Sequence, residues 1–116
     1  MLSKMKKYYH QKLIRDKIPQ KIEENDGKYK TRVLGNVAFE KELKKKLIEE
    51  AKELAKAPKK EILNELADVL ELTKSIASHY KIPFSKVEKF QKVKRQKRGG
   101  FVKKIFLIWS NQKAGK

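Results

Sequence analysis

The sequence predicts an all-α protein, and three observations support this prediction. Two stretches, Val37–Lys56 and Pro58–Tyr80, repeat apolar residues at the spacing of one helix face. The Ala57-Pro58 pair breaks the chain between them, so we expect two central helices that run antiparallel. A third helix is expected from Ser85 to about Arg98, where a pair of glycines follows.

Local signals place the ends of these helices. Pro19 suits the first turn of a short helix near the N-terminus. Asn36 is expected to cap the first central helix. Ser85 and Glu88 have the spacing of a capping box, which would begin the third helix at Ser85.

The chain is short for the apolar surface that it carries. Residues 1–116 are predicted to form a single domain, in which residues 1–11 and 110–116 fray. The apolar stripes of the two central helices are wider than one helix pair can cover. We therefore expect a homodimer whose central helices together form a four-helix bundle.

The net charge is strongly positive, at +17 from 31 lysines and arginines against 14 aspartates and glutamates. Such an excess favours a polyanionic partner, such as a nucleotide, a nucleic acid or an anionic lipid. Most of the cations are lysines spread along the chain, so the excess also fits a compositional bias or heat adaptation. The charge therefore allows nucleic acid as a partner without favouring it.

Three further features of the sequence concern the compartment. The chain has no cysteine, which excludes disulfides and thiolate metal sites. Met1–Tyr9 is polar and lacks the apolar segment of a signal peptide. The apolar run Ile105–Trp109 is much too short to span a membrane. We expect a cytoplasmic protein without a membrane partner.

Two acidic pairs stand out from this basic background. Glu50 and Glu53 lie on the first central helix, and Glu65 and Asp68 lie on the second. In each pair the carboxylates are three residues apart, which places them on one helix face about a turn apart. Four carboxylates pooled between two helices repel one another unless a cation lies among them. The sequence therefore predicts a divalent-metal site.

Glu50 is the most informative of these residues. It falls inside the apolar stripe of Leu43, Leu47 and Leu54, where a carboxylate without a partner is costly to bury. For any one acidic pair the alternative is an ordinary solvated face, because helices rich in glutamate and lysine are common. An inward Glu50 together with a second acidic pair favours the metal site.

Two basic groups are candidates for binding phosphates. One lies in the N-terminal segment and consists of Lys12, Arg15 and Lys17. Its alternative is a charged arm that binds no ligand. The other lies in the last turns of the third helix and consists of Lys94, Arg95 and Arg98. Cations at a helix C-terminus are favoured by the helix dipole in any case, which is the alternative here.

Three stretches of the chain resemble one superfamily. The pattern from Glu49 to Asp68, with glutamates at 49, 50, 53 and 65, is similar to the EExxE…ExxD signature of the all-α nucleoside triphosphate pyrophosphohydrolases. These are the MazG-like and phosphoribosyl-ATP pyrophosphohydrolase-like proteins. Residues 12–19, KLIRDKIP, resemble the KLVRDKIP opening of one small branch. Residues 94–101, KRQKRGGF, resemble its KREERGGF ending.

The resemblance implies a Mg²⁺-dependent reaction that cleaves a nucleotide between its α- and β-phosphates. The products would be a monophosphate and pyrophosphate, and the role would be nucleotide-pool house-cleaning. The resemblance also implies a dimer or larger oligomer and a supporting role for Glu49 beside the metal ligands. The ligands that it implies for Mg²⁺, with Mn²⁺ as a substitute, are Glu50, Glu53, Glu65 and Asp68. Glu50 or Glu53, if left partly free of metal, would take the proton of the attacking water. The triphosphate contacts that it implies are Lys94, Arg95 and Arg98.

A second class of function stays open. The chain would then be a small basic nucleic-acid-binding or scaffold protein that has kept the helical frame and lost activity. Such a binder gains nothing from four carboxylates, because they repel phosphate unless a metal is present. The sequence therefore favours the enzyme, and it leaves the base and sugar of the nucleotide open.

Overall fold

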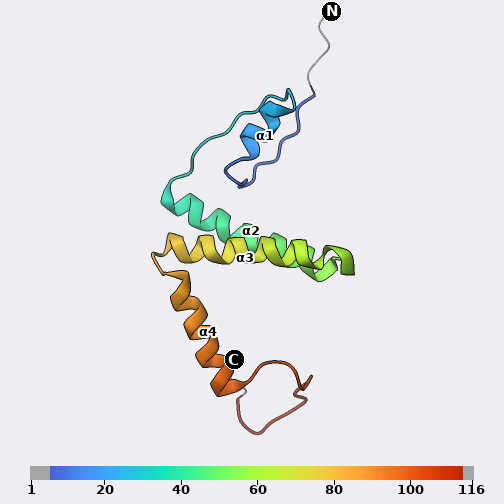
Figure 1. Cartoon of the computed structure of the whole chain (residues 1–116), viewed down its shortest axis with the longest axis vertical. Helices are drawn as coiled ribbons and strands as arrows, with labels where there is room; N and C mark the ends of the chain where they lie inside the picture. Colours follow the sequence, from blue (N-terminus) through green and yellow to red (C-terminus); the bar gives the residue numbers. More distant parts are fainter. Residues whose placement is uncertain (1–5, 114–116) are drawn as a thin grey trace, which may run out of the picture. The chain divides into compact units, whose positions relative to one another are not determined.

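The computed structural model describes residues 6–113, and this part of the chain is all-helical (Figure 1). In chain order the elements are α1 (Ile18–Glu24), α2 (Asn36–Lys56), a 3₁₀ turn (Lys59–Glu61), α3 (Ile62–His79) and α4 (Phe84–Arg98). No strand occurs within residues 6–113, so the predicted all-α class is confirmed. The chain divides into two compact units, one ending at Lys81 and the other beginning at Ile82.

The ends of the chain carry no helix where the structure describes them. Residues 6–11 and 110–113 have no regular secondary structure. The other residues predicted to fray, 1–5 and 114–116, lie outside the described part of the chain. No helix within residues 6–113 combines the length and the apolar character needed to cross a bilayer.

α1 has the proline that the sequence predicts in its first turn. A tight turn follows the helix, in which the backbone N–H of Gly27 donates to the carbonyl oxygen of Ile22 at 2.8 Å. A β-carbon at position 27 would collide with the Ile22 side chain, so this turn requires a glycine.

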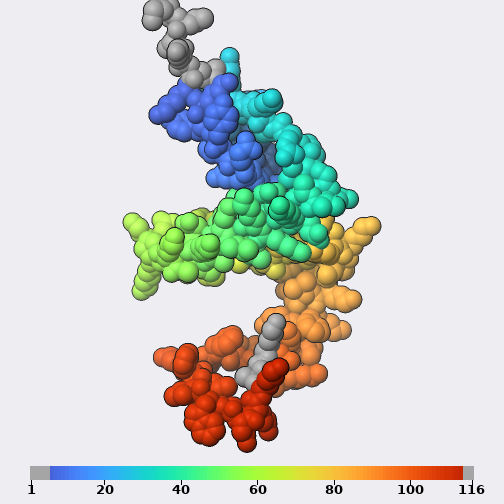
Figure 2. All heavy atoms as spheres, turned by 180° about the vertical axis from the view of Figure 1, so that it is seen from behind, coloured from blue at the N-terminus to red at the C-terminus, as the bar shows by residue number. Residues whose placement is uncertain are grey.

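The centre of the first unit is the antiparallel pair of α2 and α3 (Figure 1), and the green and yellow atoms of this pair lie against each other in Figure 2. α2 ends at Lys56 because Ala57 precedes a proline and takes an extended conformation, with φ −64° and ψ 135°. The 3₁₀ turn then reverses the chain into α3. The predicted cap at Asn36 is wrong, because Asn36 is already the first helical residue and Gly35 occupies the capping position without a side chain.

The core between these helices is small. Three apolar residues are buried within residues 6–113, namely Leu43, Leu72 and Ala77. Leu43 belongs to the stripe predicted for α2. On α3 the buried residues are Leu72 and Ala77, whereas Leu66 is 49% exposed in the single chain. Part of the apolar surface of α3 therefore stays uncovered.

The second unit contains α4 and the segment that follows it. α4 begins at Phe84, one residue before the predicted start, and Pro83 occupies the capping position without a side-chain hydrogen bond. The capping box predicted from Ser85 is therefore wrong, because Ser85 lies inside the helix. Gly99 ends α4 with a φ of 82°, a conformation that favours glycine. Large apolar side chains follow α4 and are exposed, from Phe101 to Trp109.

Candidate metal centre

Three of the four predicted metal ligands come together between α2 and α3. Glu50, Glu65 and Asp68 each offer a carboxylate oxygen, and these three oxygens lie within 4.8 Å of one another. All three side chains are half-buried. The antiparallel pairing produces this arrangement, because it sets the middle of α2 against the first turns of α3. We call these three residues the acidic cluster.

Glu65 is the innermost member of the acidic cluster. Its Oε2 is buried and has no hydrogen-bond partner among the described residues. Burial raises the pKa of the Glu65 carboxyl, and the negative charges of Glu50, Asp68 and Glu53 raise it further. A buried carboxylate oxygen without a donor is costly, and a bound cation would offset that cost.

The chemistry of the donor set fits the predicted metal. All donors are carboxylate oxygens, which are the ligands that Mg²⁺ and Mn²⁺ prefer. Two of them, Glu65 and Asp68, are three residues apart on one helix, and Glu50 closes the group from the other helix. Mg²⁺ takes about six oxygen ligands and usually keeps several waters, so three protein ligands would leave coordination positions open.

Glu53 and Glu49 lie outside this group of three. Both are exposed on α2. Glu53 is still close enough for its charge to raise the pKa of Glu65, so it borders the acidic cluster. Its roles as a metal ligand and as a base stay predictions, as does the supporting role of Glu49.

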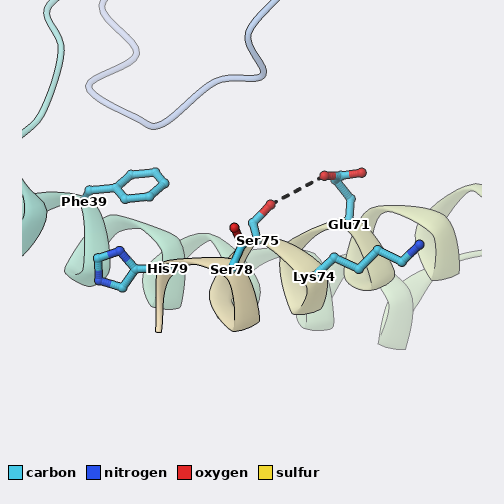
Figure 3. Close-up of a pocket in the computed structure, with 6 residues that line it drawn as sticks. All are labelled: Phe39, Glu71, Lys74, Ser75, Ser78 and His79. Carbon is cyan, nitrogen blue, oxygen red and sulfur yellow. Dashed lines mark hydrogen bonds between the residues drawn. The ribbon is translucent and has the colours of Figure 1, made fainter. Parts of the chain in front are cut away.

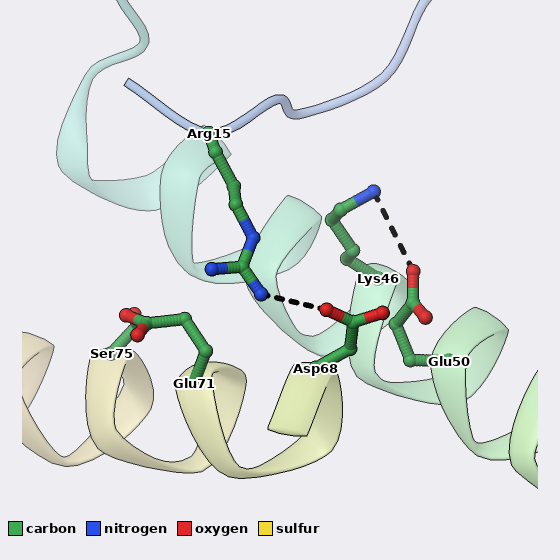
Figure 4. A network of polar contacts seen from close by, with 6 residues as sticks. All are labelled: Arg15, Lys46, Glu50, Asp68, Glu71 and Ser75. Atoms are coloured by element: carbon green, nitrogen blue, oxygen red, sulfur yellow. Dashed lines mark hydrogen bonds and ion pairs between the residues drawn. The ribbon is translucent and has the colours of Figure 1, made fainter. Parts of the chain in front are cut away.

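Two cations border the acidic cluster (Figure 4). Arg15 reaches in from the N-terminal segment, and its Nη2 donates to Asp68 Oδ1 at 2.8 Å. Lys46 lies one turn before Glu50 on α2, and its Nζ is 4.0 Å from Glu50 Oε1. From the sequence, Arg15 was predicted to bind phosphate, and no role was predicted for Lys46. The spacing of four residues between Lys46 and Glu50 could have predicted this ion pair from the sequence.

Lys12 and Lys17, the other predicted phosphate contacts of the N-terminal segment, are both exposed. They flank Arg15 in the sequence and belong to the first unit, as the acidic cluster does. Their assignment to substrate stays a prediction.

The predicted phosphate contacts on α4 belong to the second unit. Lys94 lies over the Phe90 ring, with its Nζ 5.5 Å from the ring centroid. The Arg95 guanidinium lies against Gly100, where a β-carbon would collide with it. Arg98 lines a hollow of about 510 Å³ that residues 98–105 enclose. That these three residues bind a triphosphate stays a prediction.

A second hollow, of about 410 Å³, lies in the first unit toward the end of α3 (Figure 3). Its lining combines aromatic, charged and hydroxyl side chains, namely Phe39, Glu71, Lys74, Ser75, Ser78 and His79. The Ser75 hydroxyl donates to Glu71 Oε2 at 3.4 Å. Glu71 follows Asp68 by one helical turn, so this hollow continues along α3 from the acidic cluster.

A polar network that the sequence did not reveal joins the start of α2 to the end of α3. The imidazole Nε2 of His79 is 3.8 Å from Glu40 Oε1, and the Phe39 ring meets His79 edge-on. A hydrogen bond from Tyr80 lowers the pKa of Glu40, and the charges of Lys44 and His79 lower it further. Phe39 and His79 belong both to this network and to the lining of the hollow, so the network forms the wall of the hollow near the end of α3.

The first unit therefore combines a carboxylate group suited to a divalent ion, a guanidinium bound to one of its members, and a polar hollow further along the same helix. Such a set can hold a metal, attract phosphate and accept hydrogen bonds from a sugar or base. No protein-family model, no curated protein and no solved structure matches this chain.

Proposed function

We propose that this protein is a nucleotide pyrophosphohydrolase, which cleaves a nucleoside triphosphate or a related nucleotide to the monophosphate and pyrophosphate. The observation that carries the proposal is the acidic cluster with its buried, unpartnered Glu65 oxygen. Although the chain has a net charge of +17, these three clustered carboxylates attract a cation and repel an anion. The resemblance of residues 12–101 to the MazG-like superfamily supports the same function.

The residues of the acidic cluster have distinct roles in this proposal. Glu50, Glu65 and Asp68 would hold Mg²⁺, and Glu53 would join them from the border of the acidic cluster. When bound, the metal supplies charge neutralisation for the triphosphate and lowers the pKa of an attacking water. Glu53 or Glu50 takes the proton of that water as its oxygen bonds to the α-phosphorus.

The cations act on the leaving group. As the bond between the α-phosphorus and the bridging oxygen breaks, negative charge builds on the departing pyrophosphate. The resemblance assigns the contacts to this leaving group to Lys94, Arg95 and Arg98. Lys12, Arg15 and Lys17 bind phosphate from the N-terminal segment. Arginine suits this role because its fork donates two parallel hydrogen bonds to phosphate oxygens.

We further propose that the active form is a homodimer in which α2 and α3 of two chains form a four-helix bundle. The uncovered apolar residues of this helix pair support it, namely Ile48, Leu63, Leu66 and Leu70. Exposed clusters of this kind mark association surfaces. Sedimentation at micromolar concentration is expected to give twice the chain mass, and a monomer would contradict the bundle.

The positive charge supports one competing function, a basic nucleic-acid-binding protein. Its binding would fall steeply with salt, would ignore Mg²⁺ and would survive removal of the carboxylates. The proposed enzyme requires both the metal and the carboxylates.

The test is a panel of nucleoside triphosphates with Mg²⁺, with pyrophosphate and orthophosphate measured separately. We expect pyrophosphate, formed by the wild type and by Glu88→Gln, which removes an exposed carboxylate on α4. Asp68→Asn is expected to form none. Salt-sensitive RNA or DNA binding without any turnover would support the competing function instead.

A further inference from the structure

Arg15 enters the acidic cluster from outside the helix pair. It joins Asp68 across 53 positions of the sequence, and residues 12–15 belong to no helix (Figure 4). Its guanidinium therefore holds one oxygen of a carboxylate that also belongs to the group suited to a metal. A metal and this guanidinium compete for the same side chain.

We propose that Arg15 is a built-in counter-cation of the metal site: a divalent ion displaces its guanidinium from Asp68, and the freed guanidinium then binds the phosphates of the nucleotide. This inference rests on the proposed function and adds an order of events to it. The metal binds first, and its binding prepares the protein for the anionic substrate.

The exchange at Asp68 favours the metal. The ion pair is only partly shielded from water, since the Arg15 side chain is 56% exposed and the Asp68 side chain is 31% exposed. Ion pairs as exposed as this one are weak. A divalent ion carries twice the charge and meets three carboxylates at once, including the Glu65 oxygen that has no donor in the described part of the chain.

Arg15 is free to move while its backbone stays in place. Its carbonyl oxygen accepts a hydrogen bond of 3.1 Å from the Ile18 backbone N–H, which ties it to the start of α1. The long side chain can then swing from Asp68 to a phosphate by changing rotamers alone. Lys46 makes a longer contact with the acidic cluster, with its Nζ 4.0 Å from Glu50 Oε1, so the exchange at Asp68 involves the closer of the two cations.

The test measures metal binding and turnover separately. Mn²⁺ is titrated at low salt, without nucleotide, into the wild type, Arg15→Ala, Arg15→Lys and Arg32→Ala. Arg32 is an exposed arginine between α1 and α2, so its variant controls for the lost charge. Free Mn²⁺ is followed by electron spin resonance, and circular dichroism checks the fold of each variant.

The two measurements are expected to change in opposite directions. Arg15→Ala should bind Mn²⁺ about 2- to 5-fold more tightly, the range expected for removing an exposed competing cation. Its kcat/KM at saturating Mg²⁺ should fall about 10²-fold, as for a lost contact to developing charge. Arg15→Lys should bind Mn²⁺ as the wild type does and lose only part of the turnover. Arg32→Ala should leave both unchanged.

Each other result overturns a definite part of the inference. Unchanged or weaker Mn²⁺ binding by Arg15→Ala overturns the displacement, because no competition then exists. Tighter Mn²⁺ binding with normal kcat/KM overturns the phosphate contact. If the wild type binds no Mn²⁺, the proposed metal site itself is wrong, and this inference falls with it.

A second measurement needs no variant. The chain has four arginines, Arg15, Arg32, Arg95 and Arg98, so their side-chain N–H signals can be resolved by NMR. Mg²⁺ should shift the Arg15 signal, and a non-hydrolysable triphosphate should shift it again. An Arg15 signal that ignores Mg²⁺ would overturn the displacement even if the variants fail to fold.

Discussion

Glu50 on α2 and Glu65 on α3 bring carboxylate oxygens within 4.8 Å of each other, and Asp68 completes the group. Like charges this close destabilise the chain that holds them. The burial of one Glu65 oxygen adds to this cost. The acidic cluster therefore weakens the fold in the absence of a cation, which makes stability a direct probe of the site.

Glu65→Gln is expected to raise the melting temperature of the protein in EDTA at neutral pH by a few degrees. Burial and the neighbouring carboxylates raise the pKa of Glu65, so the folded chain disfavours its charged form. The unfolded chain keeps the ordinary pKa. Stability is therefore lost as the pH rises from that value through the raised pKa of the folded state, and the penalty is fully present above it.

Thermal melts followed by circular dichroism check this prediction across pH. The difference between wild type and Glu65→Gln should vanish below about pH 4, where the carboxyl is protonated in both states. Glu88→Gln, on exposed surface, should melt as the wild type does at every pH. A lower melting temperature of Glu65→Gln at neutral pH would show that the carboxylate stabilises the fold.

Asp68→Asn and Glu50→Gln are each expected to lower Mg²⁺-dependent turnover by at least about 10²-fold while the fold survives. Each change removes one negative charge from the acidic cluster, so the stability of the metal-free protein should stay level or rise. Turnover assays measure the loss of activity, and circular dichroism checks that the fold survives. An unfolded variant would show that the carboxylate is structural.

Arg98→Ala is expected to lower kcat/KM by about 10²-fold if Arg98 meets the departing pyrophosphate. The change leaves Gly99, with its φ of 82°, to end α4 as before. Lys86→Ala, in the first turn of the same helix, is the matched control and should keep normal kinetics. Steady-state kinetics on the best nucleotide check both variants, and normal kinetics of Arg98→Ala would show that Arg98 does not contact the pyrophosphate.

Leu43→Ala is expected to lower the free energy of unfolding by about 2–5 kcal/mol, the usual range for a buried leucine. Leu43 is 3% exposed and belongs to a core of few residues, so little else compensates for its loss. Val33→Ala is the control, because Val33 is 99% exposed. Urea titration measures the free energy of unfolding of both variants. Equal unfolding midpoints for Leu43→Ala and Val33→Ala would show that Leu43 does not belong to the stabilising core.

The helices were predictable because their signals are local. The apolar spacing predicted α2 and α3 to within a few residues, and Ala57-Pro58 marked the turn between them. The inward position of Glu50 followed from the same spacing, and its side chain is 19% exposed. The predicted capping residues were wrong because Gly35 and Pro83 occupy the capping positions. Neither residue makes a side-chain hydrogen bond to its helix.

The contacts between distant segments were not predictable in this way. Arg15 and Asp68 are 53 positions apart, and nothing in either local sequence signals their ion pair. The same holds for Glu40 and His79, which meet only because α2 and α3 run antiparallel. Helical periodicity gives the face of a side chain on its own helix, whereas these pairs depend on how two elements pack.

The most direct test of the proposed function is hydrolysis of a nucleoside triphosphate with Mg²⁺ in ¹⁸O-labelled water. Attack on the α-phosphorus places the new oxygen on the monophosphate and leaves the pyrophosphate unlabelled. Mass spectrometry of the two products reads this directly. We predict label in the monophosphate alone, and none in either product with Asp68→Asn. Label in the pyrophosphate, or orthophosphate as the first product, would contradict the proposed reaction.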